Sequence, residues 1–198
     1  MTVDIKDELH RKLKVGRANL LANLDDLGEY DLRRPITPTG TNLLGLVKHL
    51  AGLEYGYLGD CVGRSPRERL AWMDDGSVGE GADMWAKPTE SKTYIVDLYR
   101  RACAHADATV DELELDTPAD VPWWSEPATT LGVLLVRMLA ETAQHAGHAD
   151  IVRELIDGRV GNTEDQLGDD AAFWNRYVAD PGSCRRIQTI SRVTGTSV

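Results

Sequence analysis

The fold of this chain is decided by the stretch LGVLLVRMLAETAQHAGHADIVRELIDG, residues 131–158. Its apolar residues recur at the spacing of an amphipathic helix that follows a cap at Thr129 or Thr130 and ends at Gly158. We expect the hydroxyl of Thr142, the one polar residue in the apolar stripe, to donate to a carbonyl one turn earlier. The stripe comprises Leu131, Leu135, Met138, Thr142, Ala149, Val152 and Ile156.

Three further segments show the same periodicity, and no segment alternates with a period of two residues. Their approximate ranges are 6–27, 42–62 and 90–115. Between the second and third segments lies the irregular stretch 63–89, with one possible short helix around 66–73. The sequence therefore predicts an all-α protein, an antiparallel four-helix bundle with a long crossover between helices two and three. Such a crossover permits a topology other than simple up-down-up-down.

Length and composition limit the class of protein. At 198 residues the chain fits one domain, which we place at residues 1–180, with a short helix at 169–179 and a polar tail at 181–198. The net charge of −10 argues against a nucleic-acid partner and against an anionic membrane surface. The N-terminus has no apolar core, and no run approaches the length of a membrane span. We therefore expect a soluble cytoplasmic protein.

The cysteines favour the same compartment. Cys61, Cys103 and Cys184 are odd in number, widely spaced and contain no CxxC pair. Reduced and mostly buried thiols are the plain interpretation. We expect Cys61 and Cys103 to pack in the core rather than to act as nucleophiles.

The fourth helix carries a possible chelate. Glu141 and His145 are four residues apart, and His145 and His148 three, so either pair shares one helical face. His145 falls inside the apolar stripe, whereas Glu141 and His148 lie about 40–60° to one side of it. His49, on the shoulder of the second helix, supplies a third donor. Three protein ligands would leave an open coordination position, but these side chains could equally form a hydrogen-bonded structural cluster.

Other polar residues favour structural roles. Glu54 falls on the apolar side of the second helix, so we expect a buried ion pair, with Arg137 as a candidate partner. His10 and His105 have no comparable neighbours and are expected at the surface. The aromatic residues near the long loop and ahead of the fourth helix could line a pocket or belong to the core. They are Tyr55, Tyr57, Trp72, Trp85, Trp123 and Trp124.

Two motifs together resemble a known family. The stretches TPTGTNLLGLVKHLAGLEYGYLGD (37–60) and ETAQHAGHADIVRELIDG (141–158) look like the second and fourth helices of the DinB/YfiT-like superfamily. The chain resembles in particular its actinobacterial branch of small uncharacterised and thiol-linked proteins, over about residues 5–180. The resemblance implies a four-helix bundle that holds one divalent ion, usually zinc or nickel.

The resemblance also implies a ligand set. The second-helix ligand falls on His49, and the family's run H-x-x-x-H-R-G-Q falls on ETAQHAGH. Glu141 and His145 then form the ligand pair, with glutamate first as in the mycothiol-dependent maleylpyruvate isomerase branch. His148 takes the place of a common glutamine, beside the ligands or facing the substrate. The expected metal is zinc first and nickel second.

The implied function is a divalent-metal-dependent thiol S-transferase. It would use a low-molecular-weight thiol such as mycothiol and a small electrophilic substrate, and it is expected to be a homodimer. The catalytic group would be the metal-activated thiol, since a divalent cation deprotonates a thiol that coordinates it. Isomerisation through a reversible thiol adduct is a sister possibility. The alternatives are a non-catalytic dimeric bundle with a stress-related or regulatory role and a metal-dependent hydrolase.

Overall fold

The computed structural model describes residues 4–159, residue 161 and the isolated positions 172, 175, 176 and 179. The chain divides into two units, residues 1–163 and 164–198, and only the first is described below. The predicted tail at 181–198 and most of the predicted helix at 169–179 lie outside the described residues. The domain boundary at residue 180 therefore stays a prediction.

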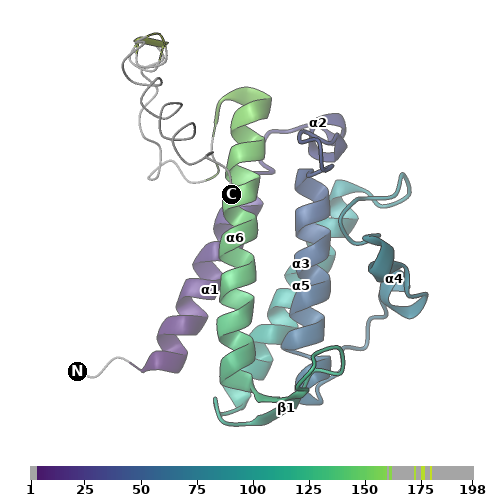
Figure 1. The fold of residues 1–198 in the computed structure, drawn as a ribbon, viewed down its shortest axis with the longest axis vertical. Coiled ribbons are helices and arrows are strands. Elements are labelled where there is room, and N and C mark those ends of the chain that lie inside the picture. Colours follow the sequence, from purple (N-terminus) through teal and green to yellow (C-terminus); the bar gives the residue numbers. More distant parts are fainter. Residues whose placement is uncertain (1–3, 160, 162–171, 173–174, 177–178, 180–198) are drawn as a thin grey trace, which may run out of the picture. The chain divides into compact units, whose positions relative to one another are not determined.

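The first unit is mostly helical, and the all-α fold is confirmed (Figure 1). Its helices are α1 (Ile5–Ala22), α2 (Glu29–Arg33), α3 (Leu43–Tyr57), α4 (Ala71–Asp74), α5 (Lys92–Glu112) and α6 (Leu131–Asp157), with the 3₁₀ turns η1 (Asp60–Val62) and η2 (Ser77–Glu80). A hairpin that the sequence did not predict precedes α6, where β1 (Pro118–Asp120) pairs antiparallel with β2 (Ala128–Thr130).

The four long helices form two pairs that run in opposite directions (Figure 1). α3 packs against both α5 and α6, and α6 packs against α1. α5 begins beside the end of α1, where Lys92 Nζ donates to the carbonyl of Leu24 at 2.7 Å. The end of α6 meets the same region, where Arg153 donates to the carbonyl of Asn23 at 2.9 Å. α1 and α6 are therefore parallel, and α3 and α5 run against them, because the long crossover returns the chain to the end from which α3 started.

The helix ends differ from the predictions at three places. The first helix stops at Ala22, and a turn with positive φ at Asp26 separates it from α2. The second stops at Tyr57 and continues as the separate turn η1. The third begins one residue after Ser91, whose hydroxyl accepts from the backbone N–H of Tyr94. The apolar periodicity continues past the first two of these ends, which is why it overestimates helix length there.

The predicted stripe of α6 forms part of the core. Leu131, Leu135, Met138, Thr142, Ala149 and Val152 are at most 1% exposed. Gly16 lets α1 approach this stripe, since a Cβ atom there would lie 3.0 Å from Thr142 Cγ2. The expected hydrogen bond from the Thr142 hydroxyl is wrong, because this buried oxygen has no partner among the described residues. Within the described part of the chain, no helix is both long and apolar enough to cross a membrane.

Candidate metal centre

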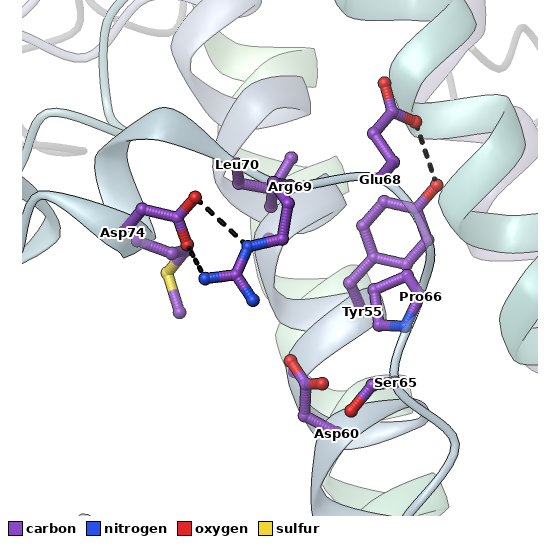
Figure 2. Close-up of a pocket in the computed structure, with 11 residues that line it drawn as sticks. Tyr55, Asp60, Ser65, Pro66, Glu68, Arg69, Leu70 and Asp74 are labelled. Carbon is purple, nitrogen blue, oxygen red and sulfur yellow. Dashed lines mark hydrogen bonds and ion pairs between the residues drawn. The ribbon is translucent and has the colours of Figure 1, made fainter.

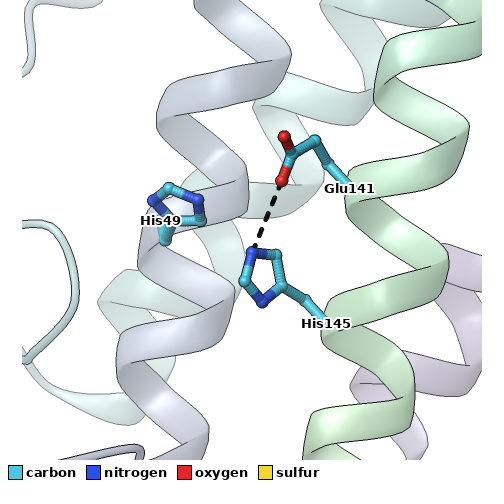
Figure 3. Close-up of side chains that lie close together, drawn as sticks. All are labelled: His49, Glu141 and His145. Atoms are coloured by element: carbon cyan, nitrogen blue, oxygen red, sulfur yellow. Dashed lines mark ion pairs between the residues drawn. The ribbon is translucent and has the colours of Figure 1, made fainter. Parts of the chain in front are cut away.

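Three potential metal ligands converge between α3 and α6 (Figure 3). His49 projects from α3, and Glu141 and His145 project from α6. One donor atom from each lies within 4.8 Å of the other two. Within this set His145 Nε2 is 3.6 Å from Glu141 Oε2, and the rings of His49 and His145 lie 5.0 Å apart at 80°. The structure thus brings together the residues that the sequence selected, and their role as ligands stays a prediction.

His145 is held as a neutral base. Burial, and then the nearby ring of His49, lower its pKa to about 4, although Glu141 opposes this shift. At neutral pH the ring is therefore uncharged, with one N–H and one lone pair, and its Nε2 faces the carboxylate of Glu141. On the opposite side of the ring, Nδ1 lies 3.3 Å from Nδ1 of the exposed His148. His148 thus touches a candidate ligand while lying outside the three-residue cluster.

The orientation of His49 is fixed by a residue that the sequence did not identify. Its Nδ1 lies 2.6 Å from Oδ2 of the buried Asp83. Burial alone would raise the pKa of Asp83, but the hydrogen bond from His49 and the charges nearby hold it below its ordinary value. The ionised carboxylate accepts from Nδ1–H, so in the neutral form of the His49 ring the free lone pair lies on Nε2. A carboxylate behind a histidine is the usual arrangement at metal sites.

The loop that carries this carboxylate is bound tightly to α3. Lys48 is fully buried, and its Nζ donates to the carbonyl of Ala82 and to the carboxylate of Glu90, both at 2.9 Å. A Cβ atom at Gly45 would lie 1.9 Å from the carbonyl oxygen of Met84, so only glycine admits the loop here. The sequence signal was a lysine beside His49 in the LLGLVKHL run, whose other residues are apolar or glycine.

Glu141 is positioned by a neighbour on its own helix. Arg137 Nη2 lies 2.9 Å from Glu141 Oε1, which leaves Oε2 facing His145. The expectation that Arg137 would pair with Glu54 is therefore wrong. Arg137 lies on the α6 face beside the cluster, whereas Glu54 is completely buried on α3 and meets α1.

Glu54 does form a buried ion pair, but with Arg17. The two side chains make a bidentate contact at 2.6 and 2.7 Å, and Arg17 also contacts Asp107. His10 joins this network through Nε2, 2.7 Å from Asp107 Oδ1, and is only 7% exposed. The expected surface position of His10 is wrong. His105 is half-buried, with Nε2 2.6 Å from a backbone carbonyl.

An apolar pocket of about 370 Å³ opens beside His49 and Asp83. Its floor is the α3 face at Gly52 and Gly56, which carry no side chains. Its walls include Leu53, Tyr57, Trp72, Met73, Val78 and Trp123. Tyr57, Trp72 and Trp123 are thus the aromatic residues, among those for which a pocket or core role was expected, that line this pocket. Trp85 is 47% exposed and lies outside the lining.

A smaller polar pocket of about 90 Å³ adjoins the first (Figure 2). The two share Gly52, Gly56 and Met73. Tyr55 belongs to this second pocket, and its hydroxyl donates to Glu68 at 3.2 Å. The polar lining carries three carboxylates against one guanidinium, from Asp60, Glu68, Asp74 and Arg69. Two of these carboxylates are paired, Asp74 with Arg69 at 2.6 Å and Glu68 with Arg101 at 2.8 Å.

The described cysteines are poor nucleophiles. Burial raises the pKa of Cys61 to about 11, and burial also raises the pKa of Cys103. Both thiols are therefore protonated at neutral pH, in agreement with the core roles expected of them. Cys184 lies outside the described residues.

The donor set fits a divalent ion of intermediate softness. Two imidazole nitrogens and one carboxylate oxygen are common ligands of zinc and also suit nickel. Ligand bonds of about 2.1 Å in a tetrahedral site place donor atoms about 3.4 Å apart. The contact of 3.6 Å between His145 and Glu141 is already close to that spacing. The remaining donor distances are within 4.8 Å, so an approach of His49 would complete three ligands and leave one position open.

The fold and this cluster define a DinB-like helical bundle. The chain belongs to the mycothiol S-transferase family, whose family model matches residues 8–158. A conserved protein from Enterococcus faecalis has a similar solved structure, with 16% sequence identity and a TM-score of 0.60. That similarity covers 80% of this chain and 100% of the other, and it supports the fold alone. No curated protein matches the chain.

Proposed function

We propose that this protein is a divalent-metal-dependent S-transferase that uses a low-molecular-weight thiol, with mycothiol as the first candidate. Membership of the mycothiol S-transferase family supports this reaction class. The single observation that carries the proposal is the convergence of His49, Glu141 and His145 within 4.8 Å, beside an apolar pocket.

The residues of the chain would hold the ion and keep its ligands in place. His49 and His145 would each offer Nε2, and Glu141 would offer Oε2. Asp83 and Arg137 orient two of these ligands from behind, at 2.6 and 2.9 Å. A divalent ion held there supplies the positive charge that lowers the pKa of a thiol placed against it.

The expected reaction is a substitution at carbon. The thiol loses its proton to solvent, and its sulfur forms a bond to an electrophilic carbon. The bond from that carbon to the leaving group breaks, and the leaving group takes the electron pair. The thiol substrate is the nucleophile. The described cysteines are poorly suited to that role, since burial raises their pKa values. An isomerase would use the same addition and then expel the thiol.

Metal analysis combined with a thiol-dependence assay tests the proposal. The full chain is purified without a histidine tag, its zinc and nickel are quantified, and turnover of an electrophile is followed with mycothiol. We expect about one equivalent of metal, and activity that chelation removes and added metal restores. Turnover without thiol would instead indicate a hydrolase. A metal-free protein that is inactive even after zinc or nickel is added would indicate a non-catalytic bundle.

Assembly and location remain predictions. We expect a homodimer, and large exposed apolar side chains on α6, at Val133, Val136, Ile151 and Leu155, are compatible with one. Sedimentation equilibrium of the full chain would measure the mass directly. A cytoplasmic location is expected from the reduced thiols and the acidic composition.

A further inference from the structure

We infer that the apolar pocket beside His49 binds the electrophile and selects uncharged compounds of about the size of two fused aromatic rings. This inference rests on the proposed function, because it identifies the second substrate of that reaction. It concerns the space between α3 and residues 72–83, not the metal ligands themselves.

The position of the pocket fits an electrophile. His49 and Asp83 form one end of the lining, so a compound in the pocket lies against a candidate ligand. The other end is closed by aromatic side chains, where the rings of Tyr57 and Trp123 lie 5.7 Å apart. A compound bound between these ends would present its reactive carbon near the thiol.

The size and chemistry of the lining favour a flat apolar compound. Benzene fills an engineered apolar cavity of about 150 Å³. A pocket of about 370 Å³ therefore accommodates a compound about twice that size. Leu53, Met73 and Val78 provide apolar contacts without hydrogen-bonding groups, and Trp72 provides a large ring.

The apolar lining disfavours charged compounds. A carboxylate or sulfonate that lies among Leu53, Met73 and Val78 loses its water without gaining a hydrogen bond from these side chains, which costs free energy. A carboxylated electrophile should therefore bind more weakly than a neutral one.

The glycine floor provides a test that spares the fold. A Cβ atom at Gly52 would lie 3.6 Å from Trp72 Nε1, and one at Gly56 3.9 Å from Trp123 Cη2. Both are ordinary van der Waals distances, so alanine fits at either position. The added methyl group occupies space that a bound compound would need. Alanine also favours the helix more than glycine does, so the variants should keep or raise Tm.

The test compares Gly52→Ala and Gly56→Ala with Gly147→Ala, a control on α6 with nothing within 4 Å of its Cβ position. Binding of the neutral fluorophore N-phenyl-1-naphthylamine to the full chain is measured without thiol. Turnover is then compared for 1-chloro-2,4-dinitrobenzene and its carboxylated analogue 4-chloro-3,5-dinitrobenzoate. We expect each floor variant to weaken fluorophore binding and raise KM by about 10-fold or more. The control should match the parent protein, and the carboxylated compound should have the higher KM.

The two readouts separate this inference from the proposed function. Loss of fluorophore binding in the floor variants supports the pocket even if no thiol transfer is found. Thiol transfer with unchanged KM and fluorophore binding in both floor variants would overturn the pocket while leaving the transferase in place. Equal KM values for the neutral and carboxylated compounds would overturn the selection against anions.

Discussion

Two groups of ionisable side chains lie inside the same bundle and use similar residue types in different ways. The first is the candidate metal centre, His49, Glu141 and His145, between α3 and α6. The second is the Arg17 network, in which Arg17, Glu54, Asp107 and His10 connect α1, α3 and α5. Each contains histidine and carboxylate, so residue type alone does not separate them.

The difference is in how the charges are paired. In the Arg17 network a guanidinium satisfies one carboxylate with two bonds and reaches a second. In the candidate metal centre Oε2 of Glu141 faces an uncharged imidazole, since the pKa of His145 is lowered to about 4, while Arg137 contacts the other carboxylate oxygen. A cation would satisfy both. A closed network stabilises the fold, whereas converging side chains that keep free lone pairs are suited to binding an ion.

Breaking the Arg17 network should have the largest effect on stability. Glu54→Ala leaves the Arg17 guanidinium buried without its main partner, so we expect the free energy of unfolding to fall by about 3–5 kcal/mol. Urea unfolding of the metal-free protein measures it. Glu112→Ala, which removes an exposed ion pair with Arg64, serves as control and should cost no more than about 1 kcal/mol. A small effect of Glu54→Ala would show that the Arg17 network does not stabilise the fold.

Removing a candidate ligand should affect function more than stability. His49→Ala is expected to lose its metal and about 100-fold or more of its activity, since loss of a ligand exceeds loss of its supporting groups. Metal content by mass spectrometry and turnover with mycothiol provide the measurement. Gln144→Ala, an exposed change on α6, is the control and should keep both metal and activity. Full metal occupancy in His49→Ala would show that the ligand assignment is wrong.

The group behind His49 should have a smaller effect. Asp83→Asn keeps the shape of the side chain but removes the charge that accepts from Nδ1–H, so we expect metal affinity to fall about 10- to 100-fold. Competition with a chelator measures that affinity. Glu80→Gln, an exposed change in the same loop, should leave it unaltered. If Asp83→Asn and Glu80→Gln both bound metal as tightly as the parent protein, the contact of 2.6 Å between His49 and Asp83 would have no role at the metal site.

The sequence predicted the parts of the fold that depend on local periodicity. The stripe of α6 is buried as expected, and the position of His145 within it directed attention to the right face of the helix. Helix ends were less accurate, because local turns at Asp26 and Gly59 interrupt segments whose apolar spacing continues. A Cβ atom at Gly59 would lie 2.3 Å from a carbonyl oxygen, and this close approach leaves no mark on the periodicity.

Contacts made by loops could not be predicted in the same way. Asp83 lies 34 residues from His49, in a stretch without helical pattern, so nothing in the spacing connects them. The partner of Glu54 was missed for a related reason. Burial of its face could be read from the helical period, but the choice between Arg17 and Arg137 depends on which helix packs there. Residue type and period thus identify candidates, and the tertiary arrangement selects among them.

The pH dependence of stability should give the smallest and most specific effect. The pKa of His145 is about 4 in the folded protein, below its ordinary value of 6.5, so protons bind the unfolded chain more readily than the folded one. The metal-free protein should therefore lose stability as the pH falls from about 6.5 towards 4. The pKa of Asp107 in the Arg17 network is also lowered, but from 3.8. Protonation of that carboxylate therefore reduces stability only at lower pH. Urea unfolding at pH 7 and pH 5 measures the His145 contribution, and His145→Gln should flatten it. If His145→Gln lost as much stability between pH 7 and pH 5 as the parent protein does, the loss would not come from His145. The pH dependence would then not distinguish the candidate metal centre from the Arg17 network.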